Sequence, residues 1–193
     1  MEIDIKKTAL VLIDLQRGIV SGDVGPNTSE TVVGNAAKIA DAMRRVYAPV
    51  VLVRVTFAAD GGDRLSQRVD QPAATQLAPG WDEIVPVIGP RDGDIMVVKH
   101  QWGAFHDTGL DLQLRRRGID TIILAGISTS IGVESTARAA YEHFYSIVLV
   151  EDAMADRVPE AHENSVQRIF PRLGRVRRTS DVLTLIGQHS ASL

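Results

Sequence analysis

The 193-residue chain contains no cysteine, which excludes disulfide bonds, thiolate metal ligands and thiol catalysis. Aromatic residues make up only 5% of the chain, and no apolar run approaches the roughly 20 residues that a membrane-spanning helix needs. Positive charge is not in excess either, because 21 basic residues stand against 24 acidic ones. We therefore expect no nucleic-acid or membrane partner and a small molecule as the ligand.

The chain start offers no export signal. Residues 1–7 carry acidic groups where a signal peptide has basic ones, and only about five apolar residues follow before Asp14. We therefore expect a cytoplasmic protein that forms one domain over residues 1–193, a length sufficient for a substantial core.

Apolar runs alternate with segments of helical periodicity, which is typical of βαβ units and predicts an α/β fold with a mostly parallel sheet. The expected strands are residues 9–13, 50–56, 95–98, 121–125, 146–150 and 175–178. Helices are expected at residues 133–144 and 159–169, and a last one begins at Thr179. Residues 58–93 are rich in glycine and proline and lack periodicity, so we expect a lid over the pocket or a subunit contact there.

Three of these runs end in residues that a plain sheet would not choose: Asp14, Lys99 and, beyond a turn, Gly132. The carboxyl ends of parallel strands meet at one edge, so an acid, a base and a bare backbone turn are expected in one pocket, which favours an enzyme. Each residue also has a purely structural interpretation. Asp14 would cap a turn, Lys99 would extend from a strand end into water, and Gly132 would relieve packing at a helix start.

The segment from Gly126 to Gly132 is the most specific local signal. It is a turn from a strand into a helix, whose backbone N–H groups can stabilise a carbonyl oxygen, a carboxylate or a developing negative charge.

Four motifs together resemble the isochorismatase-like (cysteine hydrolase) family, and most of all its YecD-type bacterial branch. They are residues 10–16 (LVLIDLQ), 98–105 (VKHQWGAF), 126–137 (GISTSIGVESTA) and 148–153 (VLVEDA). The resemblance extends from about residue 7 to residue 186. It implies a single-domain, Rossmann-like fold of three layers, with a six-stranded parallel sheet, helices on both faces, and assembly as a homodimer or homotetramer.

In family members that hydrolyse amides, residues matching Asp14 and Lys99 activate a cysteine nucleophile, whose position falls on Gly132. Glycine has no side chain to form an acyl-enzyme, so that route is closed unless a neighbour replaces it. Serines at 128, 130 and 135 are candidates, but a carboxylate is a weak base for a hydroxyl. The resemblance also implies a cis peptide bond between Ile127 and Ser128.

True isochorismatases likewise lack the cysteine and keep the aspartate. By that analogy Asp14 is the general acid of vinyl ether hydrolysis, and Lys99 orients it or holds a substrate carboxylate. The nearby lysine lowers the pKa of Asp14 whereas an acid needs it raised, so burial must outweigh the lysine; otherwise Asp14 acts as a base on water. The chain lacks the arginine that isochorismatases carry after the lysine.

The expected pocket lining comprises Gln16, Gln101, Trp102, Phe105, Ile127, Ser128 and Ile131, although Trp102 and Phe105 suit the core equally well. His100 and Glu134 are weaker candidates. No metal or cofactor is expected, because the five histidines lack ligand spacing and no glycine pattern suits a phosphate; His143 and His162 are expected at the surface. Two functions stay open: a hydrolase that works without cysteine, and a non-catalytic binding protein that kept the pocket.

Overall fold

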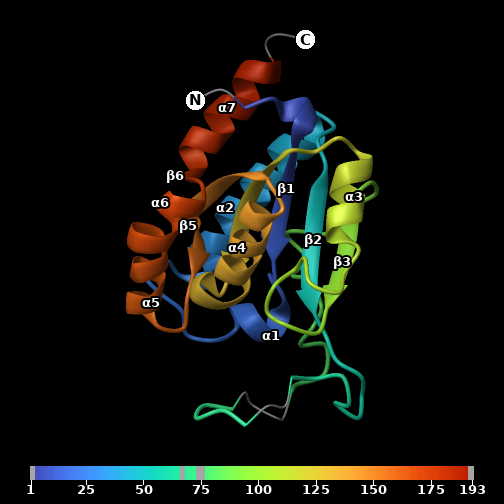
Figure 1. Cartoon of the computed structure of the whole chain (residues 1–193), viewed down its shortest axis with the longest axis vertical. Coiled ribbons are helices and arrows are strands. Elements are labelled where there is room, and N and C mark those ends of the chain that lie inside the picture. The colour runs from blue at the N-terminus through green and yellow to red at the C-terminus, as the bar shows by residue number, and fades with distance from the viewer. Residues whose placement is uncertain (1–2, 66–67, 73–76, 191–193) are drawn as a thin grey trace.

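The computed structural model describes residues 3–65, 68–72 and 77–190 and confirms the α/β fold with a six-stranded parallel sheet (Figure 1). The strand order is β3-β2-β1-β4-β5-β6. The strands are β1 (Thr8–Ile13), β2 (Val50–Val55), β3 (Ile95–Lys99), β4 (Thr121–Ile127), β5 (Ser146–Ala155) and β6 (Arg175–Arg177).

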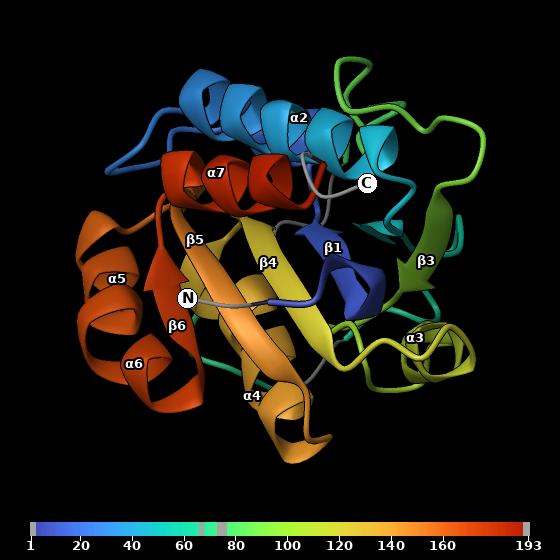
Figure 2. The same cartoon turned by 90° about the horizontal axis from the view of Figure 1, so that it is seen from above.

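Helices cover both faces of the sheet. Figure 2 shows α2 and α7 on one face, with α3, α4, α5 and α6 on the other. The helices are α1 (Arg17–Val20), α2 (Ser29–Arg45), α3 (Leu110–Arg116), α4 (Glu134–Glu142), α5 (Pro159–Asn164), α6 (Phe170–Leu173) and α7 (Thr179–Ser190). Short turns of other helix types are η1 (Ile5–Lys7), η2 (Thr129–Val133) and η3 (Ser165–Ile169). None of the helices within the described ranges is long and apolar enough to cross a membrane.

The sheet divides the core into two layers. Alternate residues of β1 enter opposite layers: Leu10 and Leu12 pack toward α2 and α7, whereas Val11 and Ile13 pack toward α3, α4 and α6. Every residue of β1 is buried because helices cover both faces, which explains the apolar run from Ala9 to Ile13.

Two elements differ from expectation. β5 continues to Ala155 because an irregularity in its pairing with β4 is followed by renewed pairing at Met154. The expected helix 159–169 is α5 followed by the wider turn η3 and then α6, in which Pro171 lacks the N–H that a regular helix would use.

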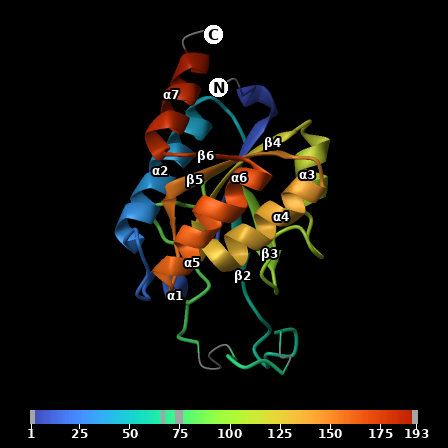
Figure 3. The ribbon, with the colours of Figure 1, turned by 60° about the vertical axis from the view of Figure 1, so that its left-hand side comes forward.

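The described part of residues 58–93 contains no helix or regular strand, and the chain after β2 extends away from the body at the carboxyl edge of the sheet (Figures 1 and 3). Its later part returns to the body. Ile84 forms an isolated bridge with Gln16, the Val85 amide donates to Leu15 O at 3.0 Å, and Ile88 is fully buried. A role as a lid or subunit contact stays a prediction.

Candidate active site

Asp14, Lys99 and Gly132 lie together at the carboxyl edge of the sheet. Asp14 follows β1, Lys99 ends β3, and Gly132 lies in η2 after β4. Lys99 Nζ is 2.7 Å from Asp14 Oδ2, and a Cβ built on Gly132 would lie 3.1 Å from that same oxygen. All three residues are buried, so the site has little contact with water.

The ammonium group of Lys99 has three acceptors. Besides Asp14 Oδ2, it donates to Gln101 O at 3.1 Å and to Trp102 O at 2.9 Å. An ammonium carries three donor hydrogens, so these contacts use its full capacity. Lys99 is thereby arranged to orient Asp14 and the loop after β3, and it has no donor left for a substrate carboxylate.

Asp14 has an unusual backbone conformation and one unused oxygen. Its φ is 53°, a value that residues with side chains rarely adopt and that recurs at functional sites. Its Oδ1 is buried and has no hydrogen-bond partner among the described residues. Burial raises the pKa of Asp14 to about 6. This effect outweighs the lowering by the charge and hydrogen bond of Lys99, and the smaller lowering by the nearby Val55 N–H, whose own hydrogen bond goes to Gln16 Oε1.

Gly126 allows β4 to approach β1 just before Asp14. Its φ is 133°, and a Cβ at this position would lie 2.1 Å from Ile13 O. No other residue fits this close approach of two backbones. The peptide bond between Ile127 and Ser128 is cis, as the family resemblance implies.

The turn after β4 begins a helical segment that runs through η2 into α4. Ser128 O accepts the amides of Ile131 and Val133 at 3.3 and 3.2 Å, which closes the turn. The backbone N–H groups in the first turn of a helix point outward beyond its amino terminus, where they favour negative charge. Gly132 lies in this first turn, facing Asp14.

The predicted lining residues divide into several groups. Ile131 is partly exposed and belongs to the turn, as does Ser128. The side chain of Ile127 is buried in the core layer that contains α2 and α7, so a part in the pocket stays a prediction for this residue. Phe105 takes the alternative that the sequence left open: it packs in the opposite core layer, where its ring stacks on His143 and lies 5.6 Å from the ring of Tyr145.

Two glutamines support the site from its sides. Gln16 is buried and pairs with the backbone of Val55 at the end of β2, donating at 2.9 Å and accepting at 2.8 Å. Gln101 donates to Gly103 O and His106 O, which shapes the loop after β3. The polar groups of both glutamines therefore contact backbone rather than open space.

The remaining candidates vary in exposure. Trp102 is 56% exposed, although its carbonyl contacts Lys99, so its ring is open to a ligand or another protein surface. His100 Nδ1 lies 2.7 Å from Thr56 O and 3.2 Å from Asp63 Oδ2. Glu134 accepts from Ser165 Oγ and pairs with Arg138. These contacts occupy His100 and Glu134 away from Asp14.

Sequence reasoning missed three buried polar residues: Thr129 in the turn, and Asp156 and His162 behind it. Asp156 Oδ2 accepts the Ser130 amide at 2.7 Å, and His162 Nδ1 lies 2.8 Å from Thr129 Oγ1. The expectation that His162 is at the surface is wrong, because only 5% of it is exposed. Asp156 follows a strand as Asp14 does, and ending β5 five residues too early concealed that signal.

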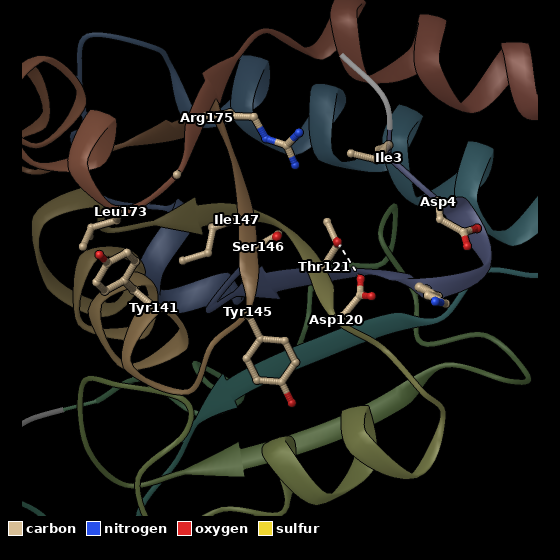
Figure 4. Close-up of a pocket in the computed structure, with 12 residues that line it drawn as sticks. Ile3, Asp4, Asp120, Thr121, Tyr141, Tyr145, Ser146, Ile147, Leu173 and Arg175 are labelled. Carbon is tan, nitrogen blue, oxygen red and sulfur yellow. Dashed lines mark hydrogen bonds between the residues drawn. The ribbon is translucent and has the colours of Figure 1, made fainter.

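A surface hollow of about 610 Å³ lies at the opposite, amino edge of the sheet (Figure 4). Asp120, Thr121, Ser146 and Arg175 line it at the starts of β4, β5 and β6. It is therefore separate from Asp14 and Lys99. No group of three acidic or histidine side chains in the described ranges is arranged to hold a metal ion.

Comparison with known protein families matches residues 8–181 to the isochorismatase domain. The chain belongs to the isochorismatase family. It is 48% identical over 187 residues to the uncharacterized isochorismatase family protein YecD of Escherichia coli O157:H7, covering 96% of this chain and all of YecD.

Solved structures of this family share the fold. An isochorismatase family protein from Burkholderia thailandensis is 43% identical with a TM-score of 0.91, covering 94% of this chain and 96% of that one. N-carbamoylsarcosine amidase from Thermoplasma acidophilum is 31% identical with a TM-score of 0.73, covering 90% of this chain and 96% of that one. The chain is accordingly a member of a family of hydrolases.

Proposed function

We propose that this isochorismatase family member hydrolyses a vinyl ether in a small molecule that bears a carboxylate, without a covalent intermediate. Asp14 is the general acid in this proposal. The observation that carries it is the carboxyl of Asp14, which is buried, has a pKa raised to about 6, and keeps Oδ1 without a partner among the described residues. A carboxyl with these properties can hold a proton near neutral pH and donate it from one defined oxygen.

The proposed reaction balances with water as the only co-reactant. The proton on Asp14 Oδ1 moves to the terminal methylene carbon, whose double-bond electron pair forms the new C–H bond. Water adds to the resulting oxocarbenium carbon and returns a proton to Asp14. The hemiketal then divides into a keto acid and an alcohol.

Lys99 has a positioning role in this scheme. Its three contacts hold Asp14 Oδ2 and the loop after β3, which leaves Oδ1 as the oxygen to carry the proton in this scheme. The turn amides around Gly132 are suited to a substrate carboxylate at the amino end of the η2–α4 segment.

A nucleophilic mechanism has less support. Gly132 offers no nucleophile, and its surroundings are tight, with a built Cβ 3.0 Å from Ile13 Cγ2. Among the described residues, no base lies within hydrogen-bond range of the hydroxyl of Ser128, Ser130 or Ser135. A serine without an adjacent base is a poor nucleophile.

The second candidate is a non-catalytic binding protein that keeps the pocket. Gly132 and the absence of an arginine after Lys99 favour it. The retention of both Asp14 and Lys99 favours chemistry, because a buried ion pair is costly to keep for folding alone.

Pyruvate release from isochorismate tests the proposal, with lactate dehydrogenase and NADH oxidation as the readout. We expect release by the unmodified protein and its loss in Asp14→Asn. The matched control is Asp92→Asn, an identical change at an exposed aspartate. Release that survives Asp14→Asn would contradict the acid role. No release would reject isochorismate, and binding of small carboxylates without turnover would favour the second candidate.

A further inference from the structure

The turn that faces Asp14 is held from behind by two buried polar residues of the segment after β5. Figure 3 shows α4, α5 and α6 on the same face of the sheet. Asp156 follows β5 directly, and His162 lies in α5. They contact two consecutive residues of the turn, Ser130 and Thr129, so the turn has two independent anchors.

Asp156 connects four segments. Its Oδ2 accepts the Ser130 amide at 2.7 Å, and its Oδ1 accepts the Val158 amide at 3.1 Å at the start of α5. Its backbone N–H and carbonyl both pair with Gly25 at 2.8 Å. The side chain is almost fully enclosed, so these bonds are not exchanged with water.

The contact between His162 and Thr129 is equally enclosed. Nδ1 and Oγ1 are 2.8 Å apart, Thr129 has no exposed surface, and His162 is 5% exposed. Burial lowers the pKa of His162, and the charges of Asp156 and Glu163 only partly oppose this. A neutral imidazole and a hydroxyl can each donate or accept a hydrogen bond, so the two groups satisfy each other. Removing either one leaves the other buried without this hydrogen-bond partner.

We propose that His162 and Asp156 are positioning residues for the active-site turn: they fix Thr129 and Ser130 and thereby the Gly132 backbone opposite Asp14. The inference rests on the proposed function only in assigning this turn to the reacting centre. Neither residue touches the space between Gly132 and Asp14. Both act through the backbone of η2, whose amides must keep a fixed direction to stabilise an anion.

An engineered thiol at position 132 tests this without any substrate. The chain has no cysteine, so Gly132→Cys introduces a single thiol whose ionisation is followed by thiolate absorbance at 240 nm, with the Gly132 parent subtracted. Helix amino-terminal amides favour the thiolate, and the charges of Asp14 and Lys99 also act on it. Asp14 and Lys99 are unchanged in the variants below, so a difference in ionisation constant between variants reports how the turn amides are directed.

In the Gly132→Cys background, Thr129→Val removes the hydroxyl while keeping the branched shape. We expect the thiol ionisation constant to fall by about fivefold to thirtyfold, the size of one buried hydrogen bond. Thr129→Ser keeps the hydroxyl and should stay within about twofold of the background. The matched control is Thr184→Val on α7, where a hydroxyl bonded to Ser180 O is removed far from the site.

Substitutions at His162 complete a double-mutant cycle with Thr129. His162→Phe should lower the constant as Thr129→Val does, and the double variant should show no further loss, because both changes remove the same bond. His162→Asn retains a polar group near the position of Nδ1 and should restore part of the effect. Asp156→Asn can accept one backbone amide but not two, so it should also lower the constant.

The inference is overturned if Thr129→Val and Thr129→Ser have the same ionisation constant, or if the effects of Thr129→Val and His162→Phe multiply. Urea unfolding of each variant separates a misplaced turn from a protein that is not folded. Where a substrate is turned over, Thr129→Val should lower kcat/KM mainly by raising KM, because the turn amides are the proposed site of the substrate carboxylate. A failure to hydrolyse isochorismate leaves the thiol result fully interpretable, so the two proposals fail separately.

Discussion

Lys99 Nζ donates to Asp14 Oδ2 at 2.7 Å, while the other oxygen of the same carboxyl is buried and unpartnered among the described residues. The two oxygens of Asp14 therefore differ: Lys99 holds Oδ2, whereas Oδ1 is left without a hydrogen bond from the described residues. The pKa of Asp14 is nevertheless about 6, because burial of the carboxyl outweighs the lowering by Lys99.

The pH dependence of hydrolysis should identify the protonation state that reacts. With Asp14 as acid and a pKa of about 6, about a tenth of it is protonated at pH 7, and kcat/KM should fall about tenfold per pH unit above pH 6. Initial rates between pH 4.5 and 8.5 measure this. A rate that instead rises to a plateau above pH 6 would assign Asp14 the role of base.

The free energy of unfolding should also depend on the protonation of Asp14. The pKa of Asp14 in the folded protein lies above the value near 3.9 of an unfolded aspartate, so the folded state binds this proton more tightly. The resulting stabilisation is complete below about pH 4 and is lost as the pH rises through 6. Urea unfolding should show the wild type losing about 2 kcal/mol relative to Asp14→Asn between pH 4 and 7. Parallel curves would contradict the raised pKa.

Lys99→Met should keep the alkyl packing and remove the charge. It leaves Asp14 without its cation and two carbonyls without a donor, so we expect a loss of about 3–5 kcal/mol in the free energy of unfolding at pH 7. The decline in kcat/KM that follows deprotonation of Asp14 should move to higher pH, because the lysine no longer lowers the pKa of Asp14. Lys38→Met, at an exposed lysine of α2, is the control and should change stability by less than about 0.5 kcal/mol.

Two glycine-to-alanine changes should have opposite signs. At Gly126 a Cβ would lie 2.1 Å from Ile13 O, so Gly126→Ala should destabilise the protein by more than about 3 kcal/mol and displace Asp14. At Gly34, within α2, nothing lies within 4 Å of a built Cβ, and Gly34→Ala should stabilise by about 0.5–1 kcal/mol. Thermal unfolding of the two variants measures both; equal effects would refute the close approach at Gly126.

The site was predictable to the extent that it depends on strand ends. Asp14, Lys99 and the turn to Gly132 each follow an apolar run, and parallel strands bring such ends together whatever the details of packing. Side-chain direction was not predictable in the same way. Ile127 and Phe105 lie within two of the family motifs, yet their side chains enter opposite core layers.

The amino-acid sequence by itself determined the order of strands and helices, the α/β class, the family and the meeting of Asp14 with Lys99. Hydrophobic periodicity and the order of elements can be read from the sequence, and a parallel sheet places the residues that follow its strands at one edge. Only the tertiary structure decided that Asp14 is buried enough to outweigh Lys99, and that Asp156 and His162 hold the turn from behind. Those outcomes depend on distances between segments more than 20 residues apart, and no local pattern encodes such distances.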